Sequence, residues 1–186
     1  MYLAASQVIN RLEASVSPAK PILQTALLYG VGAGIVCALW IIGLYMAGSN
    51  PYGPKRLMAI FVPPVAVVLG QWKLRRYYKP EGPGILKSTG TGLLIALFAA
   101  VVSAGGVYTF ARVTGPEPIA RHLVEMRHLL EQSKPMFLKE KNGQQQYEST
   151  YRGLAFSAQG LAADDYMRKL IVGVLLSIPG GIFLRK

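Results

Sequence analysis

The stretch Pro21–Pro54 reads PILQTALLYGVGAGIVCALWIIGLYMAGSNPYGP and contains no Asp, Glu, Lys or Arg. Its first 28 residues are almost wholly apolar. An α-helix needs about 20 apolar residues to cross the hydrocarbon layer of a bilayer. The sequence therefore predicts a membrane-spanning helix over Ile22–Met46, and the rest of the chain is interpreted with the membrane as its solvent.

Three further charge-free segments, each flanked by Lys or Arg, predict that the chain crosses the membrane four times. They are Leu57–Trp72, Ser88–Ala111 and Leu170–Leu184. The first and last of these are short, about 24 and 22 Å as helices, but snorkelling basic side chains or an earlier helix start over residues 162–169 add length. The alternative is that both are buried helices of a soluble domain, which the two longer spans disfavour. We expect an all-α fold, an integral membrane four-helix bundle.

The composition argues against several classes of function. The net charge of +11 would favour a nucleic-acid partner in a soluble protein. Here the basic residues flank the spans and no segment combines them with base-stacking aromatics, so no nucleic acid is expected as a partner. The single cysteine, Cys37, allows neither an intrachain disulfide nor a thiolate metal cluster. The first twenty residues lack the apolar run of a cleavable signal peptide.

Basic residues near the span ends predict the orientation. Residues 72–87, WKLRRYYKPEGPGILK, carry five Lys or Arg against one Glu, so this loop is expected in the cytoplasm. Four spans then place both termini there, with eight basic residues near span ends inside and five outside. Spans one to three with their loops occupy residues 21–112, and residues 170–186 form span four with the cytoplasmic end.

Two further segments show helical apolar periodicity outside the spans. Residues 1–20 predict a cytoplasmic amphipathic helix lying in the membrane interface, or an ordinary helix packed on a neighbouring protein. Residues 113–169 predict an exoplasmic helical hairpin between spans three and four. Its first helix should end near Ser133, and Lys139–Gly143 should form the turn. The first helix carries an apolar stripe that we expect to bind a partner, formed by Ile119, Leu123, Met126 and Leu130.

Small residues at four-residue spacing predict where the spans pack closely, since in lipid close backbone approach replaces the hydrophobic force between helices. They form an intramolecular seam or an oligomer contact and are Ala26, Gly30, Gly34 and Ala38 in span one, and Gly92, Ala96, Ala100 and Ala104 in span three. A second set is typical of an interfacial anchor that also binds anionic lipid: Trp72, Arg75, Arg76, Tyr77 and Tyr78.

Polar groups inside the predicted spans are few. Apart from Cys37 and some tyrosines, no ionisable side chain falls within them, which argues against a pump or proton-coupled carrier. Pro63–Pro64 and Pro179–Gly181 predict kinks, although such breaks can also expose carbonyls to a solute. Asp164–Asp165 is interpreted as an acidic pair at the N-terminus of the fourth span's helix.

The run His122, Glu125 and His128 is the one candidate for metal or catalytic chemistry. The two histidines are about 240° apart around a helix, so three ligands do not converge, and a solvated polar face is the better interpretation. No nucleophile–base pair and no phosphate loop is present. We therefore expect no enzyme activity, no metal and no cofactor.

Several features together carry a family resemblance over about residues 22–186. They include the glycine-bearing first span LLYGVGAGIVCALWII, the exit WKLRRYYKPEG from span two, the glycine-led third span GTGLLIALFAAVVSA and a final span closing in Arg-Lys. This order resembles a family of small four-span membrane proteins common in Bacteroidota and described only as a domain of unknown function. Pro63–Pro64 departs from the pattern. The resemblance implies a bacterial inner-membrane location and no known activity, and it supplies no functional residues.

These observations predict a non-catalytic integral membrane subunit or accessory protein of a larger inner-membrane assembly. Its expected partners are membrane lipids and other integral membrane proteins, or further copies of itself. The alternative is a small oligomeric transporter or channel, whose sign would be a water-filled cavity reaching Pro63–Pro64 or Pro179–Gly180. A third possibility is a lipid-acting membrane enzyme built around His122, Glu125 and His128.

Overall fold

A computed structural model describes residues 19–154 and 157–185, and within these ranges the chain forms helices and no strand. The elements are α2 (Ala19–Met46), the 3-10 helix η1 (Pro54–Phe61), α3 (Val62–Tyr77), α4 (Gly84–Thr114), α5 (Glu117–Phe137), α6 (Gly143–Gly153) and α7 (Ala158–Phe183). Of the interfacial helix predicted over residues 1–20, residues 1–18 lie outside the described residues, and residues 19 and 20 begin α2.

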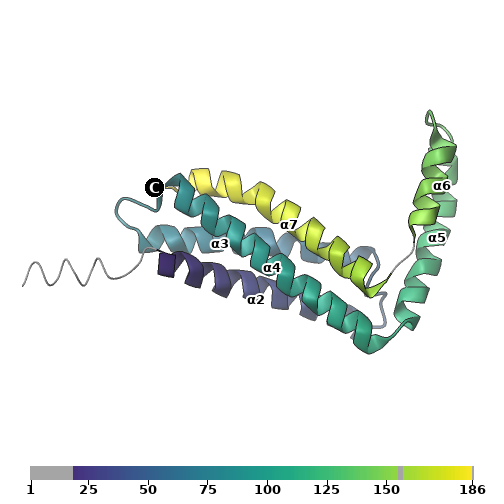
Figure 1. Ribbon diagram of the computed structural model, residues 1–186, viewed down its shortest axis with the longest axis horizontal. Coiled ribbons are helices and arrows are strands. Elements are labelled where there is room, and N and C mark those ends of the chain that lie inside the picture. Colours follow the sequence, from purple (N-terminus) through teal and green to yellow (C-terminus); the bar gives the residue numbers. More distant parts are fainter. Residues whose placement is uncertain (1–18, 155–156, 186) are drawn as a thin grey trace, which may run out of the picture.

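Four helices in the described residues are long and apolar enough to cross a membrane: Lys20–Met46, Pro54–Tyr77, Gly84–Thr114 and Ala158–Phe183. They lie side by side as one bundle, in which α4 packs against α2, α3 and α7 (Figure 1). The prediction of an all-α, four-helix membrane bundle is confirmed. The chain starts α4 next to the end of α7, where the Gly84 N–H donates to the Arg185 carbonyl at 3.0 Å. We call this end, with residues 78–83, the loop end.

Span one lies against α4 through its small residues. A Cβ on Gly30 would stand 2.7 Å from the Phe98 Cβ, and one on Gly34 would stand 2.5 Å from the Val102 Cβ. Ala26 is fully buried, and Ala38 closes the seam because a Cβ on Gly106 would lie 2.5 Å from its Cβ. These contacts are intramolecular, as the bundle-seam interpretation requires.

The small residues of α4 face two other helices. Gly92 lies between α3 and α7, with the Ser177 Cβ 2.8 Å from where its own Cβ would be. Ala96 lies 2.6 Å from the equivalent point on Gly173, and Ala100 is fully buried, whereas Ala104 is half-buried. The side of α4 that carries this stripe is therefore covered by its own chain along most of its length.

The proline positions do not interrupt the bundle. Pro63 and Pro64 are buried at the start of α3, where the 3-10 geometry of η1 changes to an α-helix. Pro179 lies inside α7, which continues to Phe183. Gly180 and the buried amide of Gln71 are in close contact, and this amide donates to the Ser88 and Ser177 carbonyls at 3.1 and 2.9 Å. The glycines after Pro179 thus permit close packing.

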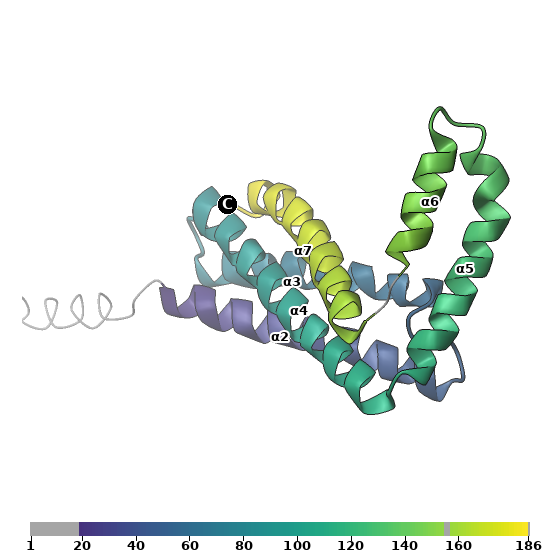
Figure 2. The same ribbon diagram turned by 45° about the vertical axis from the view of Figure 1, so that its right-hand side comes forward.

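The segment between spans three and four is a helical hairpin that runs across the end of the bundle opposite the loop end (Figures 1 and 2). We call this end the hairpin end. The predicted stop of the first helix near Ser133 is wrong, because α5 continues through Pro135 to Phe137. The Leu138 N–H bonds to the Lys134 carbonyl at 3.1 Å, so helical hydrogen bonding resumes beyond the proline. Phe137 meets Tyr147 of α6 edge-on, with ring centroids 6.0 Å apart.

Candidate functional site

Span four is longer than its charge-free sequence. Its helix α7 begins at Ala158 rather than Leu170, and the Ser157 hydroxyl caps it by accepting from the Gly160 N–H at 3.0 Å. The possible extension over residues 162–169 is therefore present, and the predicted boundary at residue 170 is too late. The assignment of Asp164–Asp165 to the helix N-terminus is also wrong, because both lie beyond the first turn, where a helix dipole acts most strongly.

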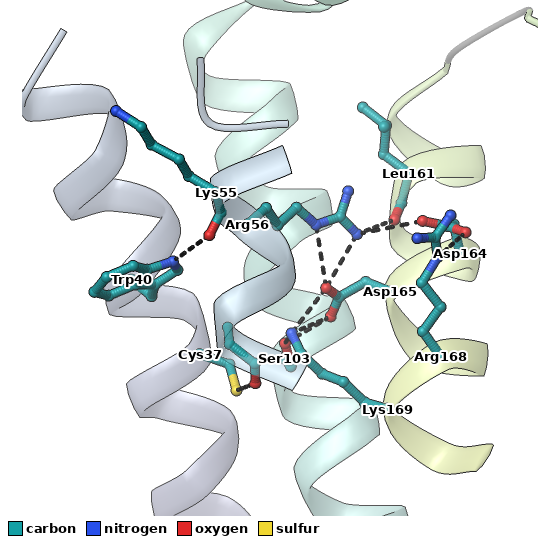
Figure 3. A network of polar contacts seen from close by, with 11 residues as sticks. Cys37, Trp40, Lys55, Arg56, Ser103, Leu161, Asp164, Asp165, Arg168 and Lys169 are labelled. Carbon is teal, nitrogen blue, oxygen red and sulfur yellow. Dashed lines mark hydrogen bonds and ion pairs between the residues drawn. The ribbon is translucent and has the colours of Figure 1, made fainter. Parts of the chain in front are cut away.

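The second span also begins early, with a basic residue turned inward. In η1, side chains three residues apart lie above one another, so Arg56 and Ala59 share the buried face. The start of this helix is held against α2, since the Trp40 indole N–H donates to the Lys55 carbonyl at 3.2 Å. The guanidinium of Arg56 consequently crosses from η1 to α7, as Figure 3 shows.

Asp165 is the centre of a buried ionic cluster. It accepts from Arg56 Nη2 at 3.0 Å, from Lys169 Nζ at 2.8 Å on both oxygens, and from the Ser103 hydroxyl at 2.6 Å (Figure 3). Lys169 follows Asp165 by one helical turn, so the two share a face of α7. Arg56 also donates to the Leu161 carbonyl at 3.1 Å. One carboxylate therefore holds η1, α4 and α7 together.

This cluster overturns the expectation of spans without ionisable side chains. Ser103 lies about 16 Å along α4 from its end at Thr114, and Cys37 of α2 lies nearby, with its thiol 3.5 Å from the Ala59 carbonyl. A charge inside a membrane bundle is costly unless it is paired. The two buried cations share Asp165, whereas the partly exposed Asp164 stands 3.8 Å from Arg56 and pairs more closely with Arg168, so Asp165 is the carboxylate on which both buried cations depend.

A cleft of about 470 Å³ opens above this cluster, between the bundle and the hairpin. Its walls combine apolar side chains with charged ones from η1, α5 and α7, among them Leu57, Ile60, Met126, Leu129, Asp164 and Arg168. Arg56, Asp165 and Lys169 line its deepest part. The cleft can therefore accept an apolar group bearing a polar or charged substituent.

The hairpin is attached to the loop after α2 by a polar contact. The Asn50 amide lies 3.2 Å from His122 Nδ1 and donates to a Glu125 oxygen at 2.5 Å. His128 faces elsewhere and contacts Gln132 at 3.0 Å. The solvated-face interpretation is thus wrong for His122, which is buried, and fits His128, which is exposed. Residues 19–154 and 157–185 contain no cluster of His, Cys, Asp or Glu able to hold a metal.

Acidification is expected to loosen this attachment. Burial lowers the pKa of His122 below its ordinary value of 6.5, Glu125 opposes the shift and Arg56 adds to it. A lowered pKa means that the unfolded chain binds the proton more readily, so the stability that the contact contributes is fully present above pH 6.5 and is lost as pH falls below that value, through the lower pKa of the folded state. The protection factors of residues 50–56 against hydrogen exchange, which are corrected for the intrinsic pH dependence of exchange, should fall at pH 5.5. The pH dependence should vanish in His122→Phe and persist in His128→Phe. If both variants showed the same pH dependence, His122 would not be the group that controls the attachment.

The predicted partner stripe is only partly available to a partner. Ile119 packs against a buried cluster that includes Tyr52 and Val107, and Leu130 is buried against the rest of the chain. Leu123 and Met126 are half-buried, and Met126 lines the cleft. The exposed apolar positions of the hairpin are others: Val124, Leu129, Met136, Leu138 and Tyr151. Ile119 and Leu130 therefore stabilise the fold and are not available to a partner.

The predicted interfacial anchor lies at the loop end of α3. The Arg76 guanidinium stacks 3.7 Å from the Trp72 ring centroid, and Tyr77 meets Tyr78 edge-on with centroids 5.4 Å apart. Lys87 stands 4.8 Å over the Tyr78 ring, and Arg75 is half-buried. Trp72, Arg76 and Tyr77 are exposed on the outside of the bundle, as an anchor requires.

Comparison with known protein families gives a match over most of the chain. Residues 28–186 match the family model described as "Protein of unknown function (DUF4199)". No curated protein and no solved structure matches the chain. The match covers all four spans from Leu28 onward, together with the hairpin and every residue of the ionic cluster. The chain, which carries four helices long and apolar enough to cross a membrane, belongs to the DUF4199 family, whose function is not known.

Proposed function

We propose that this protein is a non-catalytic accessory subunit of a larger assembly in the bacterial inner membrane, and that the cleft between hairpin and bundle receives a segment of its partner. The observation that carries this proposal is the cleft itself, about 470 Å³ in volume and lined by both apolar and charged side chains. In the orientation predicted from the basic residues near the span ends, the loop end and both termini are cytoplasmic, and the hairpin lies on the exoplasmic side.

The cleft combines apolar side chains with charged ones, as protein interfaces do. Leu57 and Leu129 stand on opposite walls, with 47% and 44% of their surface exposed. Asp164 and Arg168 pair at 2.7 Å on the rim, where both remain accessible. A partner helix or loop that inserts an apolar side chain would cover the leucines and could bond to this rim pair.

A non-catalytic role is supported by how the polar groups are used. Asp165 is engaged by Arg56, Lys169 and Ser103, while Asn50 bonds to both His122 and Glu125. His128 is not among the residues lining the cleft, so the three residues of a lipid-acting enzyme do not converge.

The transporter remains a second candidate because charged groups lie inside the membrane segment, where they often mark a solute path. The cleft, however, is not lined by Pro63, Pro64, Pro179 or Gly180, where the transporter hypothesis placed its cavity. Uptake of labelled solutes into vesicles containing the purified protein would favour transport and oppose the subunit role.

Photo-crosslinking in native membranes tests the docking site. A photoreactive residue at Met126, in the cleft, should yield one discrete protein adduct. The same group at Leu138, exposed near the hairpin tip and outside the cleft lining, serves as the matched control. The adducted protein should also co-purify with the unmodified chain. Adducts to lipid alone, or the same adducts from both positions, would contradict the proposal.

A further inference from the structure

A groove follows the seam between α2 and α3 on the outside of the bundle. It consists of two adjoining hollows of about 510 and 410 Å³, which share Leu28. The first lies toward the loop end and is lined by Gln24, Thr25, Lys73 and Arg76 among others. The second continues toward the membrane centre, and its lining is almost wholly apolar. We call the pair the α2–α3 groove.

The polar part of the groove presents two cations without an anion. Lys73 stands 5.7 Å over the Tyr29 ring, and Arg76 stacks on Trp72, so aromatic faces hold both side chains. No carboxylate lines this hollow. Within residues 19–154 and 157–185, neither cation forms a salt bridge. Two unneutralised cations at the depth of the lipid headgroups form a site for an anionic headgroup.

The apolar part of the groove offers an open path for an acyl chain, and the two parts together have the length of one leaflet. Gly32 has nothing within 4 Å of the point where a Cβ would stand, so it leaves a notch in α2. Leu28, Phe61 and Val65 line the same hollow and are 61%, 69% and 57% exposed. From Lys73 to Phe61 the helix rises about 18 Å, slightly more than one leaflet of a hydrocarbon layer of about 30 Å.

From this geometry we infer that the α2–α3 groove binds one anionic phospholipid. Its phosphate lies between Lys73 and Arg76, where the guanidinium fork and the ammonium both donate to phosphate oxygens. One acyl chain lies in the notch at Gly32, against Val65. The inference does not depend on the proposed subunit role, because the groove and the partner cleft share no lining residue and the headgroup contacts lie at the loop end.

Lipid retention on the full-length protein tests the headgroup contact. Native mass spectrometry of the detergent-purified protein, titrated with phosphatidylglycerol or phosphatidylcholine, should show preferential binding of the former. In Lys73→Gln/Arg76→Gln this preference should fall about tenfold or more, as expected from the loss of two basic contacts. The control Lys79→Gln/Arg185→Gln removes the same charge from exposed positions at the same end of the bundle. This variant should keep the preference for phosphatidylglycerol. No preference in the wild type, or equal losses in both variants, would overturn the inference.

A second variant separates a lipid from free phosphate. Gly32→Leu projects into the open hollow, and a Cβ there has nothing within 4 Å, so the fold should persist while phosphatidylglycerol binding weakens. Gly43→Leu, another glycine of α2 with open space around it, is the control and should bind normally. Inorganic phosphate should compete poorly in the wild type. If phosphate competes fully and Gly32→Leu binds like Gly43→Leu, the site holds a phosphate group alone and the lipid assignment is wrong.

Discussion

Asp165→Asn is expected to lower the free energy of unfolding by about 3–5 kcal/mol, the range found when one partner of a buried ion pair is removed. The carboxylate is 4% exposed and accepts hydrogen bonds from Arg56, Lys169 and Ser103. Asparagine has nearly the same shape but no charge, so two buried cations would share a site with no anion between them. Detergent-solubilised protein titrated with SDS and followed by circular dichroism gives the measurement.

The neighbouring carboxylate provides the control. Asp164 is 42% exposed and pairs with Arg168 at 2.7 Å, so Asp164→Asn should cost about 0–1 kcal/mol, as exposed ion pairs do. Adding Lys169→Met to Asp165→Asn should recover part of the lost stability because one unpaired cation is removed. Equal losses for the two asparagine variants would show that the cluster does not hold the bundle together.

Gly34→Leu is expected to lower the free energy of unfolding by about 1–3 kcal/mol, the cost of overpacking a tight core. A Cβ at this position would already stand 2.5 Å from the Val102 Cβ and 3.0 Å from the Ala99 carbonyl oxygen. The second of these is backbone, which cannot turn away as a side chain can. The two helices would have to separate along the whole α2–α4 seam, and the same SDS titration should report it.

The matched variant is Gly32→Leu, one half-turn away in the same helix and with nothing within 4 Å of its Cβ position. It adds the same apolar surface at the same depth, so any effect of helix propensity or lipid solvation is common to both. Its stability should equal that of the wild type. A loss as large as that of Gly34→Leu would mean that α2 and α4 do not approach as closely as described.

The number of spans and the all-α class follow from the sequence because charge-free runs of this length are stable only in a membrane or a core. The sequence also predicts the packing seams of α2 and α4. Gly30 and Gly34 recur at four-residue spacing on one face of α2, and Gly92 begins a similar stripe of small residues on α4. The spacing of the small residues is sufficient to predict close helix packing, because a glycine packs through its backbone and needs no particular partner side chain.

The ionic cluster was missed for a physical reason. A hydropathy window ends a span at the first charged residue, whereas α7 continues because Arg56 and Ser103 satisfy Asp165 and Lys169. Those partners are distant in sequence. A signal was nevertheless present: the buried residues of α7 recur every fourth position and are Leu161, Asp165, Lys169, Gly173, Ser177 and Gly181. A stripe of small residues that continues into a charged pair marks an inward-facing charge.

The partner stripe illustrates a different limit. Helical periodicity predicted that Ile119, Leu123, Met126 and Leu130 share a face, but periodicity does not distinguish a face that covers its own chain from one that awaits a partner. The structure turns Ile119 and Leu130 inward and leaves Met126 at the cleft. Which surface remains open depends on how the hairpin lies against the bundle, and its contacts there include Asn50 and Tyr52, which are distant in the sequence.

The most direct test of the subunit role is native mass determination of the tagged protein after mild-detergent purification from its own membrane. We predict a defined complex containing a second protein in stoichiometric amount, lost in Leu129→Glu, which places a charge in the cleft, and retained in Leu138→Glu, which places one outside it. A monomer or homo-oligomer for the wild-type chain, with no second protein, would contradict the account and make transport the leading hypothesis.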